Sequence, residues 1–371
     1  MKRWVRRLTR GFLIGLGLLL LLIAVEAVAG WRCPPQSEIP APVPQPEARR
    51  AETAGIKDYA RRELATYQSL PEWYIVWAYQ EKADFQKDNL PGEFPFFASV
   101  RQYWNIFCCV SRVAKGKYPS NNSEQFAQVV IGTSFSAEYV LKGLYEETIG
   151  RLSEWTSGHQ FTEEDQYAAK VAQDYAQFVH VRPFYEFQFA RRVKGLWTEN
   201  HLWGSHLLRK WERRAFLTLD YTIEAFYCWI MEKATRVSYG YEPDRTYVWL
   251  EGIDESVVRD VAGVKVLKVA GAHELIADAP RYQAFTDAAI GLSAHGARFV
   301  EIAGNPSITL SVLAPQSWPG EDRVAQRLFA LPILTRPGWQ RVFLRCDVPL
   351  LDQALNQVRA DGVTVEHIYD Y

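Results

Sequence analysis

The strongest constraint on this chain lies at its N-terminus, where basic residues come directly before a long apolar segment. Five cations open the chain: Lys2, Arg3, Arg6, Arg7 and Arg10. The run from Gly11 to Trp31 that follows contains one charged residue, Glu26. Because a helix needs about 20 apolar residues to cross the hydrocarbon core of a bilayer, the sequence predicts a transmembrane helix over residues 11–31.

The charge on the two sides of this segment predicts its orientation. Five cations precede it and only Arg32 follows closely, so the positive-inside rule places residues 1–10 in the cytoplasm as a basic tail. An alternative is a cleaved signal peptide, since Ala27 and Ala29 before Gly30 fit a small-residue processing site. Both interpretations place the bulk of the chain outside the cytoplasm, which in a bacterial-type envelope is the periplasm.

A proline-rich linker follows the apolar segment. Residues 32–50 include the stretch PPQSEIPAPVPQP, which favours an extended polyproline II conformation and excludes a helix. We therefore expect a stiff spacer between the membrane helix and a folded body.

Residues 51–241 are predicted to form an aromatic-rich helical domain. Apolar residues recur at three- and four-residue steps over residues 97–111 and 127–145, as on the buried face of a helix. Thr162 with Asp165 predicts the start of another helix that ends near Pro183. Residues 215–231 are apolar on nearly every face, which predicts the central helix of an α-helical bundle.

Residues 242–371 have a different pattern, with short strand-like runs and two helices. Their predicted order of strand, helix, two or three strands, helix and strand is that of an α+β ferredoxin-like sandwich with an additional hairpin. The expected strands are 246–250, 264–269, 298–302, 308–313, 328–335, 340–346 and 363–369, and the expected helices are 281–294 and 349–360.

Composition and motifs exclude several classes of function. The 42 Lys and Arg balance 43 Asp and Glu, so the surface has no general attraction for nucleic acid. The chain has none of the motifs of zinc proteases, α/β hydrolases, P-loop proteins or dinucleotide-binding domains, and no CxxC. We therefore predict no cofactor, and the motifs identify no catalytic residue.

Acidic residues within the apolar helical stretches are the main candidate site. Glu138, Asp220 and Glu224 would be costly to bury alone, and Glu186 lies nearby in an aromatic run. We expect them to form structural ion pairs with arginines, the candidates being Arg182, Arg191 and Arg192. The alternative is a carboxylate-rich metal centre within helices, to which His201 or His206 would add an imidazole ligand. The Glu-x-x-His pair typical of such centres is missing, so no metal is predicted.

The five cysteines, Cys33, Cys108, Cys109, Cys228 and Cys346, are few and widely spaced. We expect them mainly as buried thiols, with one disulfide between the vicinal pair and Cys228 as the alternative.

Two functions remain after these exclusions. The first is a single-pass, membrane-anchored and non-catalytic interaction or scaffold protein, attached to the lipid bilayer through residues 11–31 and binding a protein partner in the envelope. The alternative is an envelope enzyme or carrier that holds an apolar ligand in an aromatic pocket with Glu138, Asp220 or Glu224 as polar contacts. A scaffold should expose an apolar patch, whereas a carrier needs a deep pocket.

Overall fold

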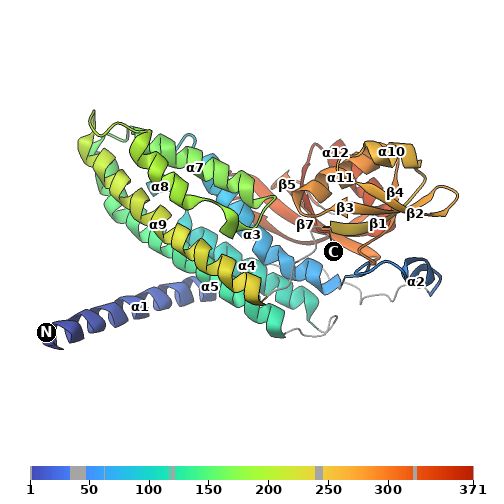
Figure 1. Ribbon diagram of the computed structural model, residues 1–371, viewed down its shortest axis with the longest axis horizontal. Helices are drawn as coiled ribbons and strands as arrows, with labels where there is room; N and C mark the ends of the chain where they lie inside the picture. The colour runs from blue at the N-terminus through green and yellow to red at the C-terminus, as the bar shows by residue number, and fades with distance from the viewer. Residues whose placement is uncertain are drawn as a thin grey trace. The chain divides into compact units, whose positions relative to one another are not determined.

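The computed structural model combines long helices with antiparallel β-sheets (Figure 1). It describes residues 2–33, 47–61, 63–115, 117, 122–238, 245–320 and 324–370. The predicted polyproline conformation of residues 34–46 lies outside these described residues. The chain forms two compact units. The helical unit contains Met1–Arg32, Pro71–Phe107 and Phe126–Tyr241, and the sheet unit contains Cys33–Leu70, Cys108–Gln125 and Glu242–Tyr371.

The N-terminal helix α1 extends over Lys2–Gly30. Among the described residues, its segment Thr9–Gly30 is the one helix long and apolar enough to cross a membrane. The C-terminal end of α1 contacts helix α4 (Phe96–Ala114), where Glu26 forms an ion pair of 2.8 Å with Arg101. A side chain at Gly30 would overlap the carbonyl oxygen of Arg101, so only glycine permits this close contact.

The rest of the helical unit follows the expected helical pattern. Its elements are α3 (Glu63–Phe85), η1 (Pro91–Glu93), α4, α5 (Asn122–Tyr145), a π-helical turn η2 (Glu146–Gly150), α6 (Arg151–Thr156), α7 (Glu163–Val179), η3 (Phe184–Glu186), α8 (Phe189–Thr198) and α9 (Leu207–Ser238). The first residues of α3 and α5 and the last residues of α4 belong to the sheet unit. Thr162 and Asp165 form the capping box that begins α7, as their spacing predicts.

The described strands of the sheet unit form two four-stranded sheets. Their orders are β2-β3-β1-β4 and β6-β7-β5-β8, and all paired strands are antiparallel. The elements are α2 (Glu47–Thr53), β1 (Arg245–Glu251), α10 (Glu255–Asp260), β2 (Lys265–Gly271), β3 (Glu274–Pro280), α11 (Gln283–Ala294), β4 (Arg298–Ile302), β5 (Ser307–Pro315), β6 (Ala325–Pro332), β7 (Trp339–Asp347), η4 (Val348–Leu350), α12 (Leu351–Ala360) and β8 (Thr364–Ile368).

Each expected strand of residues 242–371 corresponds to a strand of the structure, but two elements were not expected. Strand β3 lies between β2 and β1 in the first sheet, and helix α10 connects β1 to β2. The described strands therefore form two sheets where one sheet with an added hairpin was predicted. The apolar sides of both sheets and of α11 and α12 contribute to one core, which includes Phe285, Leu310 and Leu355.

Aromatic side chains fill much of the helical unit. Tyr175, Phe187 and Phe189 pack with ring centroids 4.8–5.1 Å apart, and Tyr79 meets Tyr175 edge to face at 4.9 Å. Such contacts between rigid rings stabilise a core beyond the burial of their area.

The disulfide differs from the expected alternative. Cys33 bonds to Cys109, so the expectation of buried thiols is wrong for these two cysteines. Cys108, Cys228 and Cys346 are buried and lie outside this disulfide. The Cys228 pairing is therefore wrong, because Cys33, which follows the apolar helix directly, reaches the vicinal pair instead.

Candidate functional site

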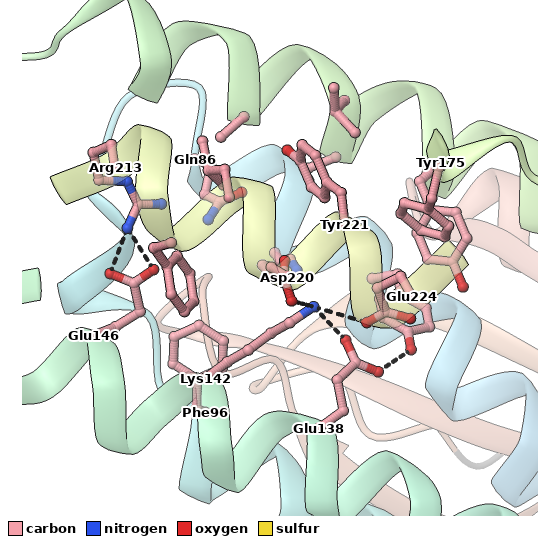
Figure 2. A pocket seen from close by; sticks show the side chains of 18 residues that line it. Gln86, Phe96, Glu138, Lys142, Glu146, Tyr175, Arg213, Asp220, Tyr221 and Glu224 are labelled. Carbon is pink, nitrogen blue, oxygen red and sulfur yellow. Dashed lines mark hydrogen bonds and ion pairs between the residues drawn. The ribbon is translucent and has the colours of Figure 1, made fainter. Parts of the chain in front are cut away.

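Helices α5 and α9 pack side by side in opposite directions. The Ser134 and Tyr227 hydroxyls lie 2.8 Å apart. About three turns further along α5, Tyr145 stacks on Phe216 with ring centroids 3.8 Å apart. On α5, Glu138 and Lys142 are four residues apart and therefore lie on one side of the helix. Asp220 and Glu224 have the same spacing on α9, and the two pairs meet between the helices (Figure 2).

Lys142 is the centre of this group, which we call the lysine–carboxylate cluster: Lys142, Glu138, Asp220 and Glu224. Its ammonium nitrogen lies 2.8 Å from Glu138, 3.2 Å from Asp220 and 3.2 Å from Glu224. Tyr79 donates a hydrogen bond of 2.6 Å to the second carboxylate oxygen of Glu138. One cation and three carboxylates from two helices thus meet in the interior of the helical unit.

A small cavity borders the lysine–carboxylate cluster. Its volume is about 50 Å³, and at roughly 10–15 Å³ per water it has room for only a few water molecules. Tyr79, Tyr175 and Tyr221 line it together with the half-buried Lys82. Carboxylates and aromatic rings therefore do converge here, but the space is too small for an apolar ligand of the size of a lipid or drug.

The surroundings change the pKa values of the cluster. Burial and the charges of Glu138 and Asp220 raise the pKa of Glu224 to about 7. Burial opposes the charge of Glu138 as well, but Lys142 and Lys82 outweigh it and lower the pKa of Glu138. Burial also disfavours the charge of Lys142, yet the three carboxylates raise its pKa well above the ordinary value.

The raised pKa of Glu224 makes its contribution to stability depend on pH. The folded protein holds this proton more tightly than the unfolded chain, where a glutamate has a pKa of 4.5. The contribution is therefore complete below pH 4.5 and is lost as the pH rises through about 7. The neutral form of Glu224 is thus the form that the fold prefers at mildly acidic pH.

A second group of buried charges lies at the N-terminal end of α9, and we call it the arginine network. Its cations are Arg209, Lys210, Arg213 and Arg214, and its anions are Glu146, Glu154, Glu163, Glu164, Asp165 and Glu212. The three arginines are no more than 1% exposed. Buried guanidinium groups need partners of this kind, because an unpaired charge in the interior is very costly.

Arg209 has the most partners in the network. It lies 2.8 Å from Asp165 and 3.2 Å from Glu212, and it donates hydrogen bonds to Ser153 and to the carbonyl oxygen of Gly150. Asp165 also caps the N-terminus of α7, so this arginine connects α9 to α7 and to the turn after α5.

Arg213 and Arg214 extend the network in two directions. Arg213 forms an ion pair of 2.8 Å with Glu146, in the π-helical turn that follows α5 (Figure 2). Arg214 forms one of 2.5 Å with Glu164. Sequence reasoning missed this network, although the run RKWERR was a signal for it.

The expected arginine partners were right for one carboxylate and wrong for the other three. Arg182 does pair with Glu186, although both are largely exposed, and Arg192 pairs with Asp174. The cation beside Glu138, Asp220 and Glu224 is Lys142. The sequence also placed Glu186 among the buried carboxylates, whereas its side chain is 45% exposed. Lys142, which the sequence analysis did not single out, takes the role expected of these arginines because it lies one turn from Glu138 on the same helix.

The two candidate histidines do not join the carboxylates. His201 lies 2.9 Å from Glu163, and His206 lies 3.0 Å from the side-chain oxygen of Gln160. Within the described ranges, no group of three or more His, Cys, Asp and Glu side chains has an arrangement that could hold a metal ion.

The outer surface of α5 and α9 is apolar although the space between the helices is charged. We define the α5–α9 face as their exposed large apolar residues. These are Phe126, Val129, Val130, Leu141 and Leu144 on α5, and Leu207, Leu208, Trp211, Leu219, Ile223, Phe226, Trp229 and Ile230 on α9, each 38–69% exposed. Leu141 precedes Lys142 and Ile223 precedes Glu224, so the two stripes flank the buried contact and form one surface.

Over a long described stretch of each helix, no charged residue is exposed. On α5 this stretch covers residues 125–145, and on α9 it covers residues 207–230. The ionisable residues of both stretches point into the unit. The prediction that residues 215–231 form a central helix was therefore wrong, because one side of α9 faces outward and is apolar.

Comparison with protein-family models, with curated proteins and with solved structures finds no match to this chain.

Proposed function

We propose that the protein is a membrane-anchored, non-catalytic interaction protein whose binding surface is the α5–α9 face. The observation that carries this proposal is the size and continuity of that face, which has large apolar side chains along two neighbouring helices. Soluble proteins rarely expose large continuous apolar patches unless a partner covers them.

The small cavity beside the lysine–carboxylate cluster supports the alternative, an envelope enzyme or carrier for an apolar ligand, less well. An enzyme or carrier for an apolar ligand needs a concave site of several hundred Å³ that is open to the ligand. The space beside the lysine–carboxylate cluster is about 50 Å³, and the carboxylates around it are already bound to Lys142. A structural role explains these charges without a ligand.

We further propose that α1 crosses the membrane with residues 1–10 in the cytoplasm and the rest of the chain outside it. The charge asymmetry around the apolar segment supports this orientation. The helical unit acts as a bundle-like binding domain. Each sheet is a ferredoxin-like module of an assembly or regulatory unit, which the strand orders support, since both place the first strand between the third and the fourth of their sheet.

Cysteine labelling in native membranes tests the proposal. We expect Leu141→Cys and Ile223→Cys to react slowly with a water-soluble maleimide, because an occupant covers the α5–α9 face. Lys170→Cys, at an exposed position of α7 in the same unit, should react quickly. Equal labelling rates at the three positions would mean that nothing covers the face, and the proposed function would be wrong.

A further inference from the structure

We infer that the occupant of the α5–α9 face is the lipid bilayer itself, so that the helical unit lies on the outer membrane surface with this face in the boundary between headgroups and acyl chains. This inference rests on the proposed function, because it names the partner of the same surface. It concerns a contact in addition to the single membrane crossing by α1.

The attachment of α1 brings the helical unit to the membrane. Glu26 and Gly30, near the end of the apolar segment, both contact Arg101 of α4, and Trp31 packs against Phe107 with ring centroids 5.7 Å apart. The helix that is apolar enough to cross a membrane therefore ends directly on this unit. A surface of the unit can rest on the bilayer without a long tether.

Charged residues are exposed on α7 and α8 of the helical unit but not on the α5–α9 face. The exposed positions of α7 and α8 include Gln166, Lys170, Gln177, Arg191 and Lys194, which favour water. The α5–α9 face has no exposed charge over roughly 32 Å of α5 and roughly 36 Å of α9, at about 1.5 Å per residue. A body with this asymmetry is stable at an interface, with the apolar side about 5–10 Å deep in the lipid.

The composition of the face fits lipid better than a second protein. Protein interfaces of standard size contain about ten direct hydrogen bonds and a polar rim. Within residues 207–230 of α9, the exposed residues are apolar except for Thr222. They therefore offer few groups for such hydrogen bonds. Aromatic residues such as Phe226 and Trp229 are typical of surfaces that lie at the membrane boundary.

Spin labels on the full-length chain in phosphatidylcholine vesicles identify the occupant. The parent carries Cys108→Ala, Cys228→Ala and Cys346→Ala and keeps the Cys33–Cys109 disulfide. Nitroxides are attached at Leu141→Cys and Ile223→Cys on the face, with Gln166→Cys and Lys170→Cys on α7 as matched controls. Relaxation by oxygen, which concentrates in lipid, is compared with relaxation by a water-soluble nickel chelate.

We expect the ratio of relaxation by oxygen to relaxation by the nickel chelate to be several-fold higher for the labels on the face than for the labels on α7. Low access to both reagents at the face would mean a protein contact, such as a second copy of the chain; this inference would then be wrong while the proposed function stands. High access to nickel at the face would overturn both. If the alanine parent melts below the wild type, the labels are placed with Cys108, Cys228 and Cys346 retained, because these are buried.

Discussion

Replacement of Lys142 by methionine is expected to lower the free energy of unfolding by roughly 3–5 kcal/mol, the usual cost of breaking a buried ion pair from one side. Methionine fills a similar volume, so the loss comes from charge. Without the ammonium group, Glu138, Asp220 and Glu224 face one another with side chains only 15–18% exposed. Urea denaturation of the wild type and the variant measures the difference.

The same variant should depend on pH in a definite direction. Protonation relieves the repulsion among the three carboxyl groups, so the destabilisation should be larger at pH 8 than at pH 5.5. Lys170→Met, on the exposed side of α7, should change stability by less than about 0.5 kcal/mol. A Lys142→Met protein as stable as the wild type at pH 8 would show that the lysine–carboxylate cluster does not hold α5 and α9 together.

Replacement of Arg209 by methionine should have an effect of similar size, roughly 3–5 kcal/mol. It leaves Asp165, which is 3% exposed, without its shortest ion pair and removes the hydrogen bonds to Ser153 and Gly150. Arg182→Met is the matched control, because Arg182 is 65% exposed and its pair with Glu186 is a surface pair of little energy.

In thermal and urea unfolding, Arg209→Met should therefore be much less stable than Arg182→Met. A loss below about 1 kcal/mol for Arg209→Met would mean that water or relaxation compensates the buried carboxylates, and the arginine network would not be a main source of stability.

The sequence predicts most elements because periodicity and capping are local signals. The capping box of Thr162 and Asp165 identifies the start of α7, and the strands rich in Val, Leu and Phe are recognisable in isolation. Strand β3 was missed because Asp278 and Pro280 disfavour a strand. In the structure Asp278 is stabilised by Arg245, an ion pair of 2.6 Å across two strands that no local pattern reveals.

The candidate site was predicted in part. Glu138, Asp220 and Glu224 do meet, but their partner was missed because a lysine is normally exposed and Lys142 gave no reason to expect burial. Its spacing of four residues from Glu138 was the available signal. The outward position of α9 could not be predicted, because a helix that is apolar on nearly every side does not show whether protein or another apolar phase covers it.

The central claim is that the exposed face binds and the buried charges only stabilise the fold. Native mass spectrometry of the purified full-length chain counts the lipids and proteins bound to it. The two variants to compare are Ile223→Lys and Glu224→Gln, at neighbouring positions of α9. Ile223 is 57% exposed, and Glu224 has a pKa of about 7 and favours its neutral form in weak acid, so both variants should fold. We predict that Ile223→Lys loses bound molecules and that Glu224→Gln keeps the wild-type number. If Glu224→Gln lost its bound molecules while Ile223→Lys kept them, the result would contradict the account and would place the binding site at the cavity.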